Sequence, residues 1–234
     1  MGKKWVLTVV AAMLLAFCFS VSVIQSYVRE VSPPSECSLV SFNDDFGGSE
    51  LDRGKWDVFE GSPIVGGGWL TLSSANIQSK SVFSGGILRG VIQSSDWKPQ
   101  GGQFTDSSFG FETWRGECHY GIIFKPSGHL AILRPVPSTD GSCSGDPLYQ
   151  AYPPIPNWDT IRAGGTVSFT LSWNPNSVTL WVSGNGQEGQ VSYAGQAIPN
   201  VPLKIRLYAQ TNESYRIDYI RLCAINVVFL PIVQ

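Results

Sequence analysis

The chain has 234 residues, of which only 15% are charged, and it contains 25 glycines and 15 prolines. This length accommodates one large β domain, and the glycines and prolines favour frequent tight turns. The formal net charge of −2 provides no basic surface of the kind that nucleic acid requires, so we expect no nucleic-acid partner.

The N-terminus has the pattern of an export signal. Lys3 and Lys4 precede an uncharged, mostly apolar run from Trp5 to Ile24, and Ser20-Val-Ser22 supplies the small residues that cleavage requires. The run is also long enough, at about 20 residues, to span a bilayer uncut. We therefore predict that residues 1–26 are a signal peptide or an N-terminal membrane anchor. Either alternative makes the domain secreted or held at the cell surface, with membrane contact only through this segment.

Short strands fill the chain after a linker at residues 27–36, and no long segment has a helical period. Apolar residues alternate strictly through Thr166–Trp173, as in a half-buried strand. Pro135–Gly165 is expected to be a long loop, either functional or pinned, and the apolar tail at 225–234 is expected to be an edge strand or a sorting or anchoring tag. Other strands are predicted at 69–72, 87–93, 109–114, 120–124, 129–133, 177–182 and 203–210.

The two ends of the domain point to a family. Near the start the chain reads Ser41-Phe-Asn-Asp-Asp-Phe-Gly-Gly-Ser-Glu-Leu-Asp-Arg-Gly-Lys-Trp-Asp57, and near the end it reads Ser214-Tyr-Arg-Ile-Asp-Tyr-Ile-Arg-Leu-Cys223. These segments resemble the first and last strands of the concanavalin A-like lectin and glucanase superfamily, in particular laminarinase-like proteins related to glycoside hydrolase family 16. The resemblance covers residues 37–224 and implies an all-β jelly-roll sandwich of two antiparallel sheets. It also implies that the partner is a polysaccharide or a cell-surface glycan.

The catalytic motif of that family is incomplete here. Laminarinase-like glycosidases carry Glu-x-Asp-x-x-Glu, and a retaining mechanism needs its two carboxyl groups about 5–5.5 Å apart. The similar segment reads Glu112-Thr-Trp-Arg-Gly-Glu117, so Trp114 replaces the middle aspartate. Arg115-Gly116 is typical of a turn, which would separate the two carboxylates. The resemblance nevertheless makes Glu112 and Glu117 the candidate catalytic pair of a divergent retaining hydrolase.

A sugar-binding surface is the other candidate site. Flat rings stack on sugar faces, and planar Arg, Glu and Gln groups bind paired hydroxyls. Strand alternation places such side chains together, opposite apolar rows, and we expect them to line one concave groove. The alternative is an ordinary solvated sheet face. The expected ligand-binding residues are Trp114, Arg89, Gln93, Arg206 and Tyr208, beside Glu112.

Three functions follow from these sites. The first is non-catalytic binding of a polysaccharide or glycan, the second is the divergent glycoside hydrolase, and the third is a structural or adhesive surface protein. An aromatic groove without a close carboxylate pair indicates the first function, and a close pair at the centre of the groove indicates the second. Neither feature is expected of the third.

Loss of Cys18 with the leader leaves four cysteines, and an even number in an exported domain indicates disulfides. Among the three possible pairings, the resemblance selects Cys37–Cys223, because the first and last strands of such jelly rolls are neighbours. Cys118–Cys143 then brackets one hairpin. No cofactor is expected to be required. The family also implies a structural Ca²⁺ at the end strands, for which Asp45 and Asp218 are candidates, with turn capping as the alternative.

Overall fold

The computed structural model describes residues 39–100, 107–115, 118–137, 143–151, 154–195 and 198–223. The predicted leader, the linker and the C-terminal tail lie outside these residues, so the domain boundaries remain predictions. Within the described ranges, no helix is long and apolar enough to cross a membrane.

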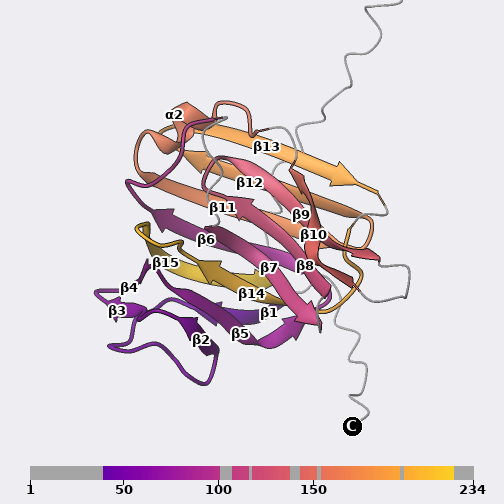
Figure 1. Cartoon of the computed structure of the whole chain (residues 1–234). Helices are drawn as coiled ribbons and strands as arrows, with labels where there is room; N and C mark the ends of the chain where they lie inside the picture. Colours follow the sequence, from indigo (N-terminus) through magenta and orange to yellow (C-terminus); the bar gives the residue numbers. More distant parts are fainter. Residues whose placement is uncertain are drawn as a thin grey trace, which may run out of the picture. The chain divides into compact units, whose positions relative to one another are not determined.

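Two antiparallel sheets make up the described domain (Figure 1). The eight-stranded sheet contains β1 (Val40–Asp44), β3 (Ile64–Gly66), β4 (Trp69–Ser73), β6 (Gly86–Gln93), β11 (Thr166–Asn174), β12 (Ser177–Gly184), β13 (Gln187–Ala194) and β15 (Ser214–Cys223). The seven-stranded sheet contains β2 (Trp56–Glu60), β5 (Asn76–Phe83), β7 (Ser108–Arg115), β8 (Cys118–Lys125), β9 (His129–Pro137), β10 (Cys143–Ala151) and β14 (Leu203–Tyr208).

The strand order shows how distant segments become neighbours. The first sheet runs β13-β12-β11-β6-β15-β4-β3, and β1 pairs with β15 as well. The predicted first and last strands are therefore adjacent, with Val40 opposite Cys223. The second sheet runs β10-β9-β8-β7-β14-β5-β2. Within the described residues, the short helix α2 (Trp158–Arg162) packs two buried side chains against the domain.

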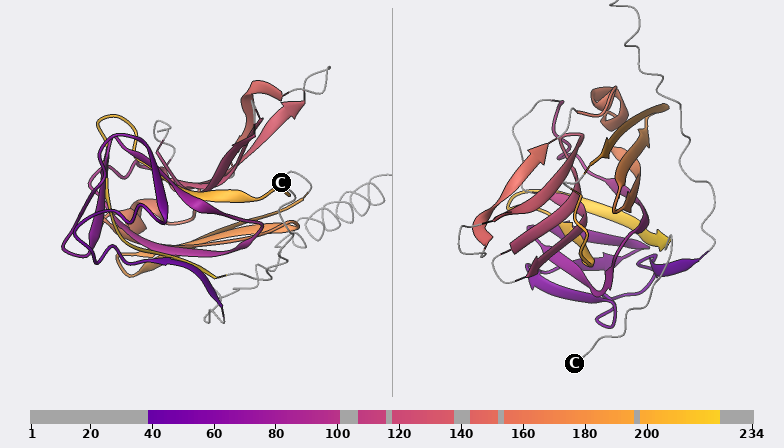
Figure 2. Two further views of the ribbon diagram at one scale, coloured as in Figure 1. Left: turned by 90° about the horizontal axis from the view of Figure 1, so that it is seen from below. Right: turned by 90° about the vertical axis from the view of Figure 1, so that its right-hand side faces the viewer.

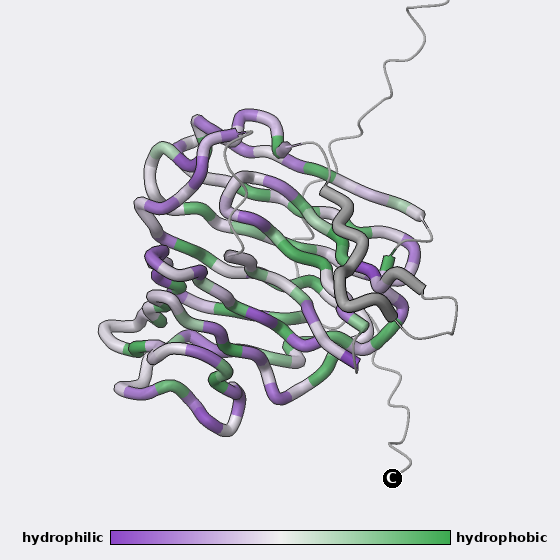
Figure 3. Tube along the Cα trace, viewed as in Figure 1, coloured by the Kyte–Doolittle hydropathy of each residue, from purple (hydrophilic) through white to green (hydrophobic). Residues whose placement is uncertain are grey.

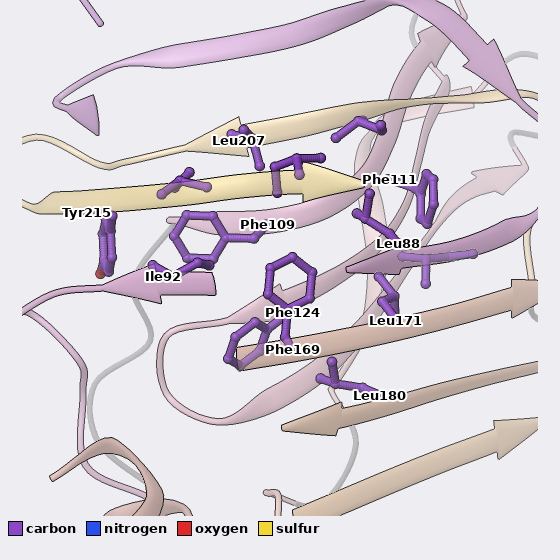
Figure 4. Close-up of a cluster of buried hydrophobic side chains, with 14 of the residues drawn as sticks. Leu88, Ile92, Phe109, Phe111, Phe124, Phe169, Leu171, Leu180, Leu207 and Tyr215 are labelled. Atoms are coloured by element: carbon purple, nitrogen blue, oxygen red, sulfur yellow. The ribbon is translucent and has the colours of Figure 1, made fainter. Parts of the chain in front are cut away.

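The core lies between the sheets because alternate residues of each strand point inward. In β11 the apolar positions 167, 169, 171 and 173 are all buried, while the positions between them are half-buried. Figure 3 shows the same alternation of hydrophobic and hydrophilic residues along several strands. Figure 4 shows Phe109, Phe111 and Phe124 of the seven-stranded sheet meeting side chains of the opposite sheet. From that sheet come Leu88, Ile92, Phe169, Leu171, Leu180 and Tyr215.

The expectation of one long loop between Pro135 and Gly165 is wrong. This stretch contains the end of β9, all of β10 and helix α2. β10 has little apolar alternation, and it is a strand because it pairs with β9 at the edge of the sheet. Two other strands with few apolar residues, β5 and the edge strand β13, were likewise absent from the predicted set. In each case pairing with a neighbouring strand outweighs weak local propensity.

The seven-stranded sheet bends at its β10 end. Figure 2 shows β9 and β10 rising out of the plane of the rest of the sheet. Ile123, Ala131 and Leu133 form a separate small buried cluster on the side of β8 and β9 that faces away from the main core. This cluster flanks the outer face on which the candidate site lies.

Candidate functional site

Glu112 is a buried carboxylate on the outward-facing side of the seven-stranded sheet, which we call the seven-strand face. Phe109 and Phe111 of β7 point into the core, so alternation turns Glu112 and Trp114 outward. The Glu112 side chain is nevertheless only 1% exposed, and it lies in register with Gly121 on β8. A charged group buried this deeply requires partners.

Two side chains from the neighbouring strands bind the same oxygen of this carboxylate. Glu112 Oε1 accepts hydrogen bonds from His119 Nε2 on β8 and from Arg206 Nη1 on β14. Arg206 is also held from other sides. Its Nε donates to Asn76 Oδ1 at 3.1 Å, and its Cζ lies 4.6 Å from the centroid of the Tyr208 ring. Glu112, Arg206 and Tyr208 thus lie together, as the sequence predicts.

The pKa of Glu112 reflects competing effects. Burial acts to raise the pKa, but the hydrogen bond from His119 and the positive charge of Arg206 outweigh it, so the pKa lies below its usual value. Glu112 is therefore ionised at neutral pH, which disfavours a role as general acid. Its other oxygen, Oε2, is buried without a hydrogen-bond partner, so neither oxygen is presented to solvent as a nucleophile.

Two glycines make room for this arrangement. A Cβ at Gly121 would lie 2.6 Å from Leu133 Cδ1 and 3.4 Å from Glu112 Cγ. Gly110, opposite Arg206, has φ +153°, and a Cβ there would lie only 2.4 Å from the backbone oxygen of Ile122. Larger residues would therefore push apart the strands that bring the partners of Glu112 together.

Trp114 is an exposed aromatic residue of the seven-strand face. Its side chain is 50% exposed, and its ring stacks on His119 with the centroids 4.0 Å apart and the planes at 12°. His119 lies directly opposite Trp114 in the β7–β8 pair. It therefore connects the aromatic surface to the buried carboxylate, a role that the sequence did not reveal. Its position could have been inferred from the register of the hairpin.

The structure gives Glu112 no nearby carboxylate among the described residues. Glu117 lies outside them, and β7 ends at Arg115, which pairs with Cys118. The other acidic residues in the strands of this sheet lie on its edge strands β2 and β10. Each edge strand is three strands from β7, or roughly 14 Å along the sheet, whereas glycosidase pairs are about 5–9.5 Å apart.

Arg89 and Gln93 do not belong to this surface. They lie on β6, in the eight-stranded sheet, with Arg89 opposite Arg221 and Gln93 opposite Arg216. The expectation that they share one groove with Trp114 is therefore wrong. Alternation shows which side of its own strand a residue occupies, but it does not show to which sheet the strand belongs.

The candidate calcium ligands stay a prediction. Asp45 Oδ1 accepts a hydrogen bond from the backbone N–H of Gly47 at 3.1 Å, which is the turn-capping alternative, and Asp218 lies at the irregular position of β15. In the part of the chain that the structure describes, no three His, Cys, Asp or Glu side chains are grouped to hold a metal ion. We derive no function through calcium.

The disulfide pairing also stays a prediction. Cys118 and Cys223 each take part in a disulfide bond. Cys37 and the side chain of Cys143, which would be their partners, lie outside what the structure describes.

Comparison with solved structures decides the fold. A pseudo beta-1,3-glucanase of Mycobacterium tuberculosis, an immunostimulatory antigen, aligns with TM-score 0.56 and 14% identity over 80% of this chain and 99% of that one. A beta-1,3-1,4-glucanase (lichenase) from a mouse hindgut metagenome aligns with TM-score 0.51 and 15% identity over 79% and 99%. The fold is a concanavalin A-like jelly roll. The predicted fold class is thus confirmed.

A third jelly roll of this kind holds a sugar. The LamA protein of Zobellia galactanivorans, in complex with laminaritriose and laminaritetraose, aligns with TM-score 0.51 and 13% identity over 80% of this chain and 99% of that one. No family model and no curated protein matches the sequence. Identities this low establish a shared fold and do not establish a shared activity.

Proposed function

We propose that this protein binds a polysaccharide or cell-surface glycan on the seven-strand face without cleaving it. The observation that carries the proposal is Trp114, an exposed ring held in a defined orientation by its stack on His119. Such a ring suits the CH face of a pyranose, and an oriented ring loses little freedom on binding.

Polar side chains on neighbouring strands of the same sheet supply hydrogen-bond donors. Lys204 lies in register with Glu112 and is partly exposed, and Lys80 on β5 is more exposed. Both form long contacts with Asp57, with N–O distances of 3.8 Å, which leave their remaining protons available to sugar hydroxyls. These groups extend the binding surface from Trp114 across β14 toward β5.

The same geometry favours binding over hydrolysis. Glu112 is buried, and its Oε1 is bound by Arg206 and His119. A divergent retaining hydrolase that uses Glu112 and Glu117 would need Glu112 to reach the sugar. The ionised state of Glu112 suits a nucleophile, so the two functions must be separated by experiment.

The experiment measures binding and turnover of laminarin and lichenan by the same preparation. Because the lost ring stack is estimated at about 1.5 kcal/mol, we expect Trp114→Ala to weaken binding about tenfold. Phe59→Ala removes another exposed aromatic ring, on the edge strand β2, and is expected to leave affinity unchanged. Glu112→Gln should weaken binding only modestly.

Reducing-sugar release decides between the functions. We expect none from the wild-type chain. Release that disappears in Glu112→Gln would establish the hydrolase instead. Full binding of both glucans by Trp114→Ala would remove the seven-strand face as the site, and the absence of any glycan binding would favour a structural or adhesive protein.

We also propose that the domain is exported. The Lys3-Lys4 pair and the apolar run to Ile24 support this, and so do the bonded cysteines Cys118 and Cys223, since disulfides persist in oxidising compartments. Mass measurement of the protein from its native host should show cleavage near Ser22, or an intact Met1 terminus in the membrane fraction. An intact chain in the cytoplasmic fraction would contradict export.

A further inference from the structure

Three arginines line the outward-facing side of the eight-stranded sheet, which we call the eight-strand face. Arg89 on β6 lies directly opposite Arg221 on β15, and Arg216 lies further along β15. The residues next to them along each strand, including Leu88 and Leu222, are fully buried in the core. Because side chains alternate along a strand, the arginines point outward. We call Arg89, Arg216 and Arg221 the arginine row.

The charge of the arginine row is not balanced by carboxylates. In the described part of the chain none of the three arginines forms an ion pair, and strands β4, β6, β11 and β12 carry no acidic residue. Asp218 is the only acidic residue on β15, and it is not paired with the row. Two like charges opposite each other in an antiparallel pair destabilise a sheet. An anionic ligand would remove that cost.

Arg89 has unused hydrogen-bonding capacity. Its Nε and Nη2 atoms are buried and have no hydrogen-bond partner. Buried donors without partners destabilise a folded protein, and native proteins keep few of them. An arginine fork that lacks an acceptor is suited to a carboxylate or a sulfate, which it can bind in bidentate fashion.

The other two arginines are held in position by neutral groups. Arg216 Nη1 donates to Gln93 Oε1 at 3.3 Å, and its Cζ lies 4.7 Å from the Trp69 ring centroid. Arg221 Nε donates to Asn43 Oδ1 at 3.1 Å. None of these contacts neutralises charge, so both guanidinium groups keep their attraction for an anion while their positions are already restricted.

The neighbouring strands extend the row with groups that bind sugars. Thr170 lies opposite Arg89 on the β11 side, and Trp181 lies opposite Thr170 on β12. Hydroxyl and aromatic groups thus follow the guanidinium groups across the sheet. This sequence of groups matches a chain of sugars that carry negative charge, whereas phosphate recognition alone has no use for the ring.

We propose that the eight-strand face binds an anionic polysaccharide through Arg89, Arg216 and Arg221. The acidic group is the carboxylate of a uronic acid or a sulfate ester, both of which present paired oxygens to a guanidinium fork. This surface lies on a different sheet from Trp114 and Glu112, and the proposal does not depend on the function proposed for that face.

The test measures binding of the full chain to dextran sulfate, polygalacturonate and uncharged dextran. Preference for an anionic polymer is expected, with affinity that falls as salt is added. Each lost charge-assisted hydrogen bond is estimated at about 1.5–3 kcal/mol, so Arg89→Gln/Arg221→Gln should weaken binding at least about tenfold per arginine. The control Arg53→Gln/Arg134→Gln removes two exposed arginines elsewhere and should bind as the wild type does.

The two anionic polymers distinguish the source of the charge. Selective binding of dextran sulfate identifies a sulfate ester, and selective binding of polygalacturonate identifies a uronate. Equal binding of uncharged dextran, an equal loss in the control variant, or no binding of either anionic polymer would overturn the proposal. Binding only to anionic lipid vesicles would overturn it in favour of a membrane surface.

Two further measurements keep the result interpretable. Trp114→Ala should leave the anionic binding unchanged, which separates this proposal from the function of the seven-strand face. Arg221→Gln removes one of the two like charges that face each other, so it should not lower the midpoint of thermal unfolding. If the Arg89 variant fails to fold, Arg216→Gln/Arg221→Gln repeats the test with two exposed positions.

Discussion

The two outer faces of this sandwich follow the same strand alternation but treat charge in opposite ways. On the seven-strand face, Glu112 is buried and bound by Arg206 and His119, and the exposed feature is a ring. On the eight-strand face, Arg89 lies opposite Arg221 without a carboxylate. The first face satisfies its charge internally and offers aromatic surface, whereas the second keeps positive charge for a ligand.

The largest effect is expected from breaking the internal ion pair. Arg206→Met leaves the buried Glu112 without its arginine partner and with only the hydrogen bond from His119, so it should cost about 3–5 kcal/mol of unfolding free energy. Arg216→Met is the matched change on the eight-strand face, where the side chain is exposed, and it should cost within about 0.5 kcal/mol. Urea unfolding measures both. Equal costs for the two variants would contradict the difference between the faces.

The second-largest loss of stability is expected from removing a predicted disulfide, and each of the two involves one of the two sheets. Replacing both cysteines of Cys37–Cys223 or of Cys118–Cys143 with serine should cost about 2–4 kcal/mol, because the unfolded chain becomes less constrained. Peptide mapping without reduction identifies the pairs directly. A Cys37–Cys118 bridge would be incompatible with both predicted pairings.

A smaller effect follows from the lowered pKa of Glu112. Its contribution to stability is complete above the unfolded pKa of about 4.5 and is lost as the pH falls through the lower pKa of the folded state. The wild type should therefore lose stability as the pH falls below about 4.5, and Glu112→Gln should lose less over the same range. Thermal unfolding at a series of acidic pH values measures this. Arg89→Gln/Arg221→Gln should keep the wild-type acid dependence.

The smallest effect is expected at the exposed ring. Trp114→Ala should cost under about 1 kcal/mol of stability, since the side chain is half exposed, whereas Trp173→Ala in the core should cost about 3–5 kcal/mol. Thermal unfolding compares the two variants. A large loss in Trp114→Ala would mean that the ring supports the fold rather than a ligand.

Local patterns in the sequence predicted many of the strands and, within them, the side on which each residue lies. The alternation in Thr166–Trp173 is seen directly in β11, and Glu112 and Trp114 share one face as expected. Arg206 was predicted to point to the other side of its strand from the apolar Ile205 and Leu207, and these two residues are buried. These features depend on residues within one strand, so the period of two is sufficient to predict them.

The pairing of strands was decided only by the tertiary structure. His119 reaches Glu112 because the β7–β8 register places it opposite Trp114, and Arg206 reaches it because β14 pairs with β7. Arg89 carries the same local signal as Arg206 but lies on the other sheet. Periodicity within a strand does not contain the strand order, which depends on contacts between residues far apart in the chain. The sequence alone therefore determined which residues face outward, and the folded structure determined which of them form a site together.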